Sequence, residues 1–376
     1  MSFERVEQEM HAAVERGVFP GAVLLVREGE RVFYLRAFGS RQTEPQAAPM
    51  QEGTIFDLSS LTKPLATGLA FMVLVREGKV HPDDRATRFF HNFGVYGKTH
   101  VTMRHLLCHS SGLAAWRPYY KEIMQIERRG EKVNFLGSDA AKEYVYQQIC
   151  RERPEGAAGV KAVYSDLGFM LLGALIEMIT GSTLDRFCQE RLYRPLGLRA
   201  MSFIDLSLVR TRRIQPVTDM IAATERCAWR KRVLCGEVHD DNAYAMGGVA
   251  GHAGLFGAAR DIDTLLCRLK ACWSGADDFI PAPVMRQFWT RDTTVPNSTW
   301  ALGWDTPSPT NSSAGTLFSA NTVGHLGFTG TSLWMDLDRD RHVILLTNRV
   351  HPNRDHNAIK EFRPAIHDSI NQALAA

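Results

Sequence analysis

The sequence lacks the patterns that mark secreted, disulfide-stabilised or membrane-spanning proteins. Its seven cysteines are odd in number, scattered and without C-x-x-C spacing, which favours reduced thiols in a cytoplasmic protein. No apolar run reaches ~18 residues without a charge, so no membrane span is expected. Residues 1–17 are charged and amphipathic and contain no continuous apolar segment of the kind found in a signal peptide.

The sequence also has no strong excess of charge of either sign. Its formal net charge is +3, and its densest basic stretches, 210–213 and 230–232, are short and separated from each other by apolar residues. Nucleic-acid and membrane surfaces attract denser runs of Lys and Arg, so neither partner is expected. With 376 residues, 45% of them hydrophobic, the chain is long enough for two domains or one large one. We expect a small-molecule substrate and no cofactor.

Strand-like and helical segments are distributed unevenly along the chain. Strands are predicted near both ends and helices between them, with Leu167–Thr180 strongly apolar and closed by Gly181. The predicted strands are Gly21–Arg27, Arg31–Phe38, Gly315–Ala320, Thr331–Asp336 and His342–Asn348, and a helix follows from about His356. This order predicts an α+β (α/β) protein in which 1–79 and 242–376 form one antiparallel sheet flanked by helices, with 80–241 as a mostly helical insertion.

The stretch Phe56–Val75 contains the first candidate for catalysis. Pro64 is tolerated only in a first helical turn, which places a helix start near Ser60, and the apolar residues that follow predict a helix buried on all sides. Ser60 and Lys63 lie three residues apart on one face of that turn. Low-dielectric surroundings would favour the neutral amine of Lys63, and an amine beside a hydroxyl can generate a nucleophile.

Two further stretches contain unusual residues before a regular element. Tyr164 directly precedes the apolar helix Leu167–Thr180, where it could either hydrogen-bond within the core or relay a proton. The segment Gly324–Thr331 has three glycines before a predicted strand, which indicates that its backbone approaches another group closely.

Taken in order, three short motifs resemble those of the serine penicillin-recognising family, which includes class C β-lactamases, DD-peptidases and their esterase relatives. The motifs are Ser60-Leu61-Thr62-Lys63, Tyr164-Ser165-Asp166 and His325-Leu326-Gly327. Flanking phrases such as 101–113, 164–173 and 254–261 are also similar to the family, so the resemblance covers nearly the whole chain. It implies a β-lactamase/transpeptidase-like fold with the active site in a cleft between the sheet domain and the helical domain.

The resemblance also implies a role for each matching residue in a serine hydrolase that forms an acyl-enzyme. Ser60 would be the acylated nucleophile, Lys63 its general base or proton relay, and Tyr164 the group that exchanges protons with the leaving group. The backbone N–H groups of Ser60 and Phe328 would form the oxyanion hole. The bond that is cleaved would be an ester, an amide or a β-lactam.

Two departures from the family pattern bear on the substrate. Asp166 stands where many members have Asn, and His325 and Leu326 stand where β-lactamases have Lys and Thr. A substrate carboxylate would therefore lose a cation and a hydroxyl, which favours esterase-like activity over the alternatives, a β-lactamase or a D-amino-acid-specific peptidase or amidase; Thr329 and Thr331 could restore the hydroxyl contacts. We expect five residues to contact the substrate: Asp166, His325, Leu326, Gly327 and His252.

Three alternative interpretations come from other residues or another class of protein. His239, Asp240, Asp241 and His252 could suggest a metal-dependent hydrolase, but they lack the spacing of a helical zinc motif, and a loop bordering the cleft is favoured. A non-catalytic binding or assembly protein is disfavoured because Ser60, Lys63 and Tyr164 are all present. Other reactive residues are interpreted as structural. His105 and His109 flank a short helix capped by Thr102, and the Cys108 thiol is expected to be buried and inert.

Overall fold

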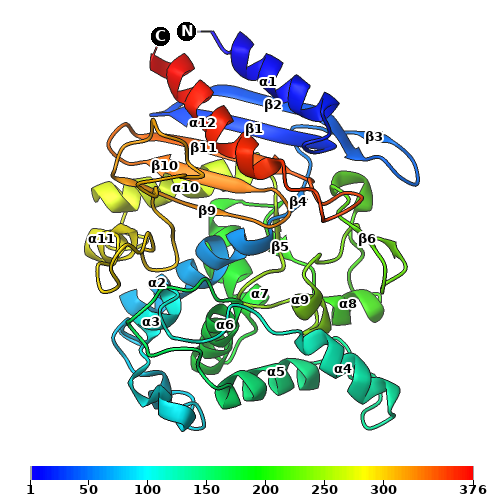
Figure 1. Cartoon of the computed structure of the whole chain (residues 1–376), viewed down its shortest axis with the longest axis vertical. Coiled ribbons are helices and arrows are strands. Elements are labelled where there is room, and N and C mark those ends of the chain that lie inside the picture. Colours follow the sequence, from blue (N-terminus) through cyan, green and yellow to red (C-terminus); the bar gives the residue numbers. More distant parts are fainter. Residues whose placement is uncertain (1, 376) are drawn as a thin grey trace.

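The computed structural model describes residues 2–375 and contains a six-stranded antiparallel sheet built from both ends of the chain (Figure 1). The N-terminal strands pair with the C-terminal ones where β1 runs beside β11, with Leu24 opposite Leu345. This arrangement agrees with the predicted sheet. In the order in which they are paired, the strands are β3 (Ala48–Pro49), β2 (Arg31–Gln42), β1 (Gly21–Glu28), β11 (Arg341–Thr347), β10 (Ser332–Asp336) and β9 (Thr322–Leu326).

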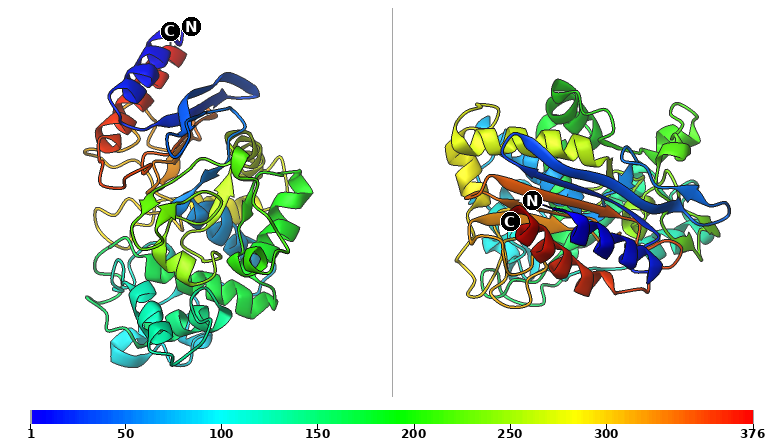
Figure 2. Two further views of the ribbon diagram at one scale, coloured as in Figure 1. Left: turned by 90° about the vertical axis from the view of Figure 1, so that its right-hand side faces the viewer. Right: turned by 90° about the horizontal axis from the view of Figure 1, so that it is seen from above.

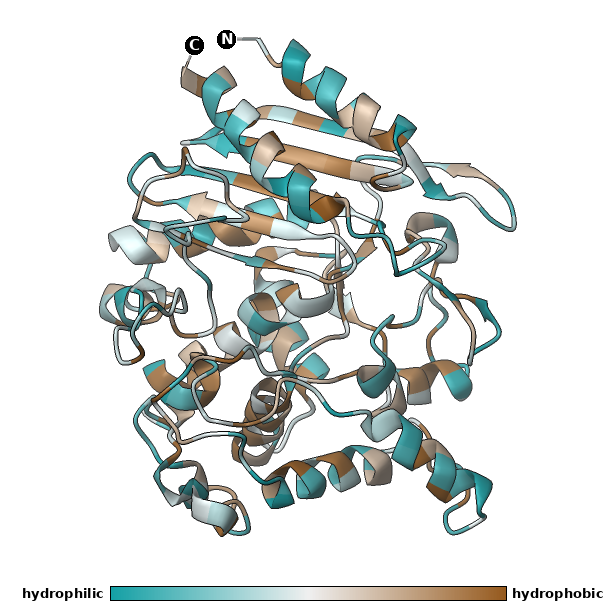
Figure 3. Ribbon diagram, in the orientation of Figure 1, coloured by the Kyte–Doolittle hydropathy of each residue, from teal (hydrophilic) through white to brown (hydrophobic). Residues whose placement is uncertain are grey.

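Helices cover both faces of the sheet. On one face lie the terminal helices α1 (Glu4–Glu15) and α12 (Ile359–Ala375), side by side in both orientations shown (Figures 1 and 2). Alternate residues of β1, such as Leu24 and Val26, pack under these helices, while Val23 and Leu25 belong to the larger core on the opposite face. The central strands β1 and β11 are accordingly mostly hydrophobic (Figure 3), because both faces of the sheet are buried there, whereas β2 carries exposed residues.

One predicted strand is wrong. The segment Gly315–Ala320 is irregular, and the strand on that side of the sheet is β9, a few residues later. The backbone N–H groups of Thr316 and Leu317 donate to Asp368 Oδ1 at 2.7 and 3.1 Å. Because a side-chain carboxylate satisfies these amides, the segment is held as a loop and does not need a neighbouring strand.

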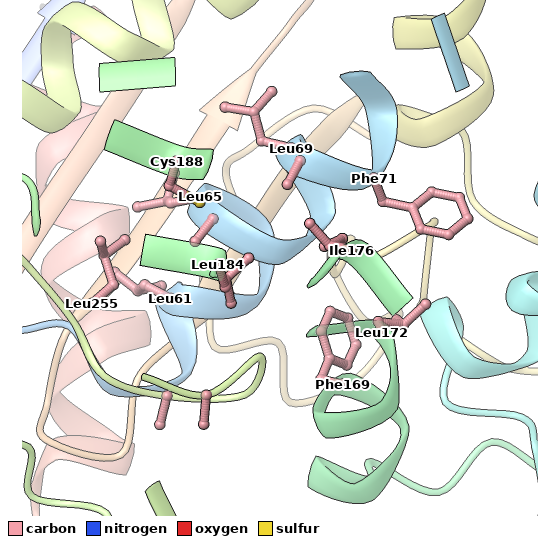
Figure 4. Packing of buried hydrophobic residues seen from close by; sticks show 14 of the residues in the cluster. Leu61, Leu65, Leu69, Phe71, Phe169, Leu172, Ile176, Leu184, Cys188 and Leu255 are labelled. Carbon is pink, nitrogen blue, oxygen red and sulfur yellow. The ribbon is translucent and has the colours of Figure 1, made fainter. Parts of the chain in front are cut away.

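The predicted buried helix after Ser60 is present but begins irregularly. A 3₁₀ turn at Ser59–Leu61 is followed by a π-helical turn at Lys63–Gly68 and then by α2 (Leu69–Arg76). All residues from Leu61 to Leu74 are buried, and the helix packs against α6 (Asp166–Thr180). Figure 4 shows side chains of both helices in one buried cluster, among them Leu69, Phe71 and Ile176. The expectation of a helix enclosed on all sides is thus confirmed.

The remainder of the chain is mostly helical and carries the second half of the site. Helix α6 ends at Gly181, whose φ of 64° is the left-handed conformation predicted for its C-terminal residue. The other α-helices are α3 (Met103–Leu107), α4 (Tyr119–Arg128), α5 (Asp139–Arg151), α7 (Leu184–Cys188), α8 (Leu206–Arg210), α9 (Asp241–Ala245), α10 (Ala259–Ser274) and α11 (Ala282–Trp289). Shorter 3₁₀ or π turns occur at Ala86–Arg88, Val95–His100, Gln189–Tyr193, Arg194–Leu196 and Thr218–Met220.

Short strands interrupt this helical part. One small sheet joins β4 (Phe56–Asp57), β8 (Leu255–Gly257) and β5 (Ser202–Phe203), and a second pairs β6 (Arg226–Cys227) with β7 (Arg232–Val233). The first of these sheets ties the segment before Ser60 to the segment after His252. The domain boundaries near residues 80 and 241 stay a prediction.

Within residues 2–375, no single helix has both the length and the apolar character needed to cross a bilayer. Only α6 taken together with the helical segment Leu184–Leu196, bent by 74° between them, meets those criteria. The residues of α6 from Leu167 to Ile176 are buried against the rest of the protein, as in the core helix of a globular fold.

Candidate active site

Ser60 and Lys63 are presented by the two irregular turns that precede α2. The ammonium of Lys63 donates to Ser60 Oγ across 3.2 Å, and the lysine side chain is completely buried. Pro64 follows directly, where its missing N–H costs no hydrogen bond. The predicted pair therefore meets at the opening of a helix that cannot shift without disturbing the core.

Lys63 is held by groups from two other regions of the chain. It donates to Asp166 Oδ1 at 2.7 Å and to the backbone carbonyl of His252 at 3.0 Å. Burial by itself would lower the pKa of Lys63, but the Asp166 carboxylate and Tyr164 outweigh it, and the pKa lies above the ordinary lysine value. The expectation of a neutral resting amine is wrong, because the fold places the Asp166 carboxylate against the lysine.

Tyr164 lies beside this pair, in the turn that leads into α6. Lys63 Nζ is 4.8 Å from the centre of its ring, and the ring also packs on His109 and Trp300, with centroids 4.6 and 5.6 Å away. His109 accepts a hydrogen bond from the backbone N–H of Ser165 at 3.0 Å, which secures the turn. Burial raises the pKa of Tyr164 against the opposing effect of Lys63, so the phenol is protonated at rest.

The third motif ends strand β9 and faces Tyr164 from the sheet. His325 is buried, with its ring 6.1 Å from that of Tyr164, and its Nδ1–H donates to the carbonyl of Leu326 at 2.8 Å. Burial and the charge of Lys63 lower the pKa of His325 to about 3. The imidazole is therefore neutral near pH 7. Gly327 is required sterically, because a Cβ atom there would lie 2.0 Å from Thr331 Oγ1.

Phe328 follows the motif at the mouth of the site. Its ring is 50% exposed, stacks on His239 at 5.7 Å between centroids and lies under the Arg349 guanidinium at 4.5 Å. The next two hydroxyls are already used, since Thr329 Oγ1 and Thr331 Oγ1 donate to the carbonyls of Asp57 and Leu58 at 2.8 and 3.1 Å. They do not restore the hydroxyl contacts that the third motif lacks.

A cavity of about 280 Å³ opens above these groups. Of the residues predicted to act or bind there, Ser60, Tyr164, Asp166, His252 and Phe328 line it. Lys63 and His325 are buried behind this lining, and Leu326 and Gly327 are also outside it. Four lining residues had not been connected with a role: Ser59, Trp116, Ala253 and Arg354. Nothing in the local sequence around Trp116 or Arg354 marks them, because only the fold brings them to the cavity.

Residues 239–241 form one wall of the cavity. The charged groups there lie in separate pairs. His239 Nε2 lies 2.9 Å from Glu225 Oε2, and His252 Nε2 lies 2.9 Å from Asp240 Oδ1. Burial raises the pKa of Asp240, but His252 and the N–H groups facing it lower the pKa overall, so that the carboxylate accepts from His252. The two histidines are thus directed to different acids and do not converge on one point, unlike the ligands of a shared metal ion.

The same wall of the cavity also carries the guanidinium of Arg354. Arg354 donates to Glu225 through Nε and lies 3.4 Å from Asp241 through Nη1. Asp241 is also engaged by Arg230 and by the Trp229 indole, both at 2.9 Å. The acids of this wall are therefore balanced by cations, and a neutral group can enter without facing a large unpaired charge.

The other reactive residues singled out in the sequence have structural surroundings. The side chains of Thr102 and His105 form a reciprocal cap at the start of α3. Each side chain accepts a hydrogen bond from the backbone N–H of the other residue. The Cys108 thiol is buried, and burial raises its pKa well above the usual range, as expected for an inert thiol. All seven cysteines are free.

Comparisons with known proteins identify relatives that match most of the chain. The sequence model described as Beta-lactamase matches residues 3–367. A putative D-alanyl-D-alanine carboxypeptidase of Escherichia coli (strain K12) is 33% identical over 363 residues, which cover 89% of this chain and 79% of that protein. An N-acetylmuramyl-L-alanine amidase of Bacillus subtilis (strain 168) is 32% identical, with 92% of this chain and 81% of the relative covered.

Solved structures share the fold at lower identity. EstCE1, a hydrolase with promiscuous acyltransferase activity, superimposes with a TM-score of 0.74 at 22% identity and covers 98% of both chains. The octameric penicillin-binding protein homologue from Pyrococcus abyssi gives a TM-score of 0.73 at 19% identity, covering 100% of this chain and 77% of that one. The match across residues 3–367, the fold and the relatives together show that the chain belongs to the Beta-lactamase family of serine hydrolases.

Proposed function

We propose that the protein hydrolyses an uncharged ester or amide through an acyl-enzyme on Ser60. The observation that carries this proposal is the convergence of Ser60, Lys63 and Asp166 at the floor of the cavity, joined by hydrogen bonds of 3.2 and 2.7 Å. A hydroxyl that contacts a buried amine group is the arrangement that serine nucleophiles require.

The first chemical step removes the proton of Ser60 as Oγ forms a bond with the substrate carbonyl carbon. Lys63 can accept this proton only in its amine form, the form that the neighbouring Asp166 carboxylate disfavours at rest. The electron pair of the carbonyl π bond moves to oxygen, where the backbone N–H groups of Ser60 and Phe328 would stabilise the charge. A preorganised donor of this kind is worth roughly 3 kcal/mol.

The tetrahedral intermediate then collapses, and the bond to the leaving group breaks. Tyr164 is protonated at rest and adjoins Lys63, so it would donate the proton that the leaving group takes up and recover one from Lys63. Water repeats the sequence in reverse: it attacks the acyl carbon, gives up a proton through the same groups and returns Ser60 to its hydroxyl form.

The preference for an uncharged substrate follows from the third motif. His325 is neutral, and the hydroxyls of Thr329 and Thr331 are occupied by backbone carbonyls. A carboxylate brought to this edge would lose water without full replacement, at a cost of about 1–3 kcal/mol or more. An ester or a neutral amide avoids that cost and can pack on the exposed ring of Phe328.

A second candidate is a peptidase or amidase that acts on amino-acid derivatives, the class named for the E. coli and B. subtilis relatives. The identities of 33% and 32% to these relatives, each over most of this chain, favour it. Comparing p-nitrophenyl butyrate, a cephalosporin and D-alanyl-D-alanine peptides separates these functions. Faster turnover of the ester supports our proposal, whereas a preference for the peptides supports the second candidate.

The nucleophile itself can be tested with a fluorophosphonate. We expect one label per chain, mapped by peptide analysis to Ser60, and no label in Ser60→Ala. Labelling of Ser59, or equal labelling of Ser60→Ala, would overturn the proposal.

We further propose that the catalytic cleft separates a sheet domain (1–79 with 242–376) from a helical domain (80–241), and that the protein acts in the cytoplasm. The first point is supported by the two sides of the cavity, and the second by the seven free cysteines.

A further inference from the structure

The amide that would complete the oxyanion hole is already hydrogen-bonded to a side chain. The backbone N–H of Phe328 donates to Ser59 Oγ across 3.2 Å. Ser59 directly precedes the predicted nucleophile, is only 8% exposed and lines the same cavity as Ser60. The hydroxyl oxygen therefore lies where an oxygen accepting from Phe328 has to lie.

The backbone around Ser59 holds this hydroxyl in place. Ser59 has a φ of 51°, a left-handed conformation that residues with a side chain rarely adopt. Its N–H donates to Asp57 Oδ1 at 2.8 Å, and its carbonyl accepts from Thr62 Oγ1 at 2.6 Å. All of these groups are buried, so the surrounding structure maintains the strained conformation.

On the Phe328 side, Gly327 leaves room for the hydrogen bond between the Phe328 N–H and Ser59 Oγ. A Cβ atom at Gly327 would come within 3.4 Å of Ser59 Cβ, besides its closer clashes with Thr331 and Leu58. The glycine thus lets the amide after the third motif approach the turn that carries Ser59 and Ser60.

We propose that the Ser59 hydroxyl occupies the Phe328 amide in the resting enzyme and has to be displaced before this amide can bind the carbonyl oxygen of the substrate. Ser59 is then a positioning residue that slows acylation. This inference rests on the proposed function, since it requires acylation of Ser60 and a role for Phe328 in the oxyanion hole.

The kinetic consequence has a defined sign. An oxyanion accepts a stronger hydrogen bond from the Phe328 N–H than a neutral carbonyl oxygen does. Competition from the Ser59 hydroxyl therefore raises the free energy of the transition state more than that of the bound substrate. The net contribution of one neutral hydrogen bond, here the bond that must be broken before the amide is free, corresponds to roughly 2- to 13-fold in rate. Removing the hydroxyl should therefore raise kcat/KM and leave KM nearly unchanged.

Two variants separate the hydroxyl from the backbone strain. Ser59→Ala and Ser59→Gly both delete the hydroxyl, but only glycine also relieves the φ of 51°. We expect both to react with a fluorophosphonate at Ser60 roughly 3- to 10-fold faster than the wild type. Ser274→Ala, which removes a hydroxyl at the end of α10 outside the cavity lining, should react at the wild-type rate.

The possible outcomes distinguish this inference from the function on which it rests. If both Ser59 variants react more slowly, the hydroxyl is a donor to the oxyanion and our assignment is overturned; equal rates overturn it as well. A gain confined to Ser59→Gly would attribute the effect to backbone strain and also contradict it. If the wild type is not labelled at Ser60 at all, the proposed function fails.

Discussion

The ammonium of Lys63 lies 2.7 Å from Asp166 Oδ1, although 103 residues separate the two in the sequence. The lysine is fully buried and the carboxylate is partly exposed in the cavity. This ion pair holds Lys63 in its charged form at rest, so the pH dependence of acylation reports on the pair and not on an isolated amine.

Asp166→Asn should move the acid limb of the kcat/KM profile to lower pH. The carboxylate raises the pKa of Lys63, so its removal lowers that pKa and the amine form becomes available in more acidic solution. The profile should be measured beside Asp278→Asn, an exposed carboxylate remote from the cavity lining, which is expected to match the wild type. An unmoved limb in Asp166→Asn would mean that the lysine is not the titrating base.

Lys63→Ala and Tyr164→Phe should not have independent effects. Both groups serve one proton transfer, and they contact each other at 4.8 Å between Nζ and the ring centre. Removing either is expected to cost nearly as much kcat as removing both, as for other residues that act as a unit. The measurement is kcat for the two single variants and the double variant. If the losses of kcat in the single variants multiply to give the loss in the double variant, the two residues do not share a role.

Leu326→Thr should shift the substrate preference toward compounds with a carboxylate. The substitution restores a hydroxyl at the end of β9 where the other threonines are occupied. We expect the ratio of kcat/KM for a cephalosporin to that for p-nitrophenyl butyrate to rise about 2- to 13-fold, the effect of one added hydrogen bond. Leu326→Val, which is smaller but apolar, serves as the control. A similar rise in Leu326→Val would attribute the change to size.

A separate charge cluster predicts acid-sensitive stability. Asp263 accepts two hydrogen bonds from Arg27, at 2.6 and 2.7 Å, and one from His342 at 2.7 Å. Burial would raise its pKa, but these partners outweigh burial and lower the pKa of Asp263 to about 2. Because the folded pKa is below the unfolded value of about 3.9, this stabilisation is present above pH 4 and is lost as the pH falls toward 2.

Urea unfolding between pH 6 and pH 2.5 measures this loss. In Asp263→Asn the free energy of unfolding should be lower at pH 6 and should fall less steeply on acidification than in the wild type. Asp278→Asn again provides the control, since that side chain is exposed. Parallel curves for Asp263→Asn and the wild type would show that the cluster does not contribute to acid sensitivity.

Local sequence was sufficient to predict the elements that depend on near neighbours. The spacing of Ser60 and Lys63 places both on one turn, Gly181 ends α6, and the strands predicted at Gly21–Arg27 and Arg31–Phe38 are present as β1 and β2. These features follow from backbone geometry and from periodic burial, both of which are encoded within a few residues.

Tertiary structure decided the features that depend on distant partners. Lys63 is charged because Asp166 and the carbonyl of His252 are folded against it, and the Gly315–Ala320 segment is a loop because Asp368 satisfies its amides. In the same way, Phe328 meets Ser59 across 269 residues of sequence. Protonation state and hydrogen-bond occupancy are set by whichever charges and donors surround a group in three dimensions, and no local pattern specifies those neighbours.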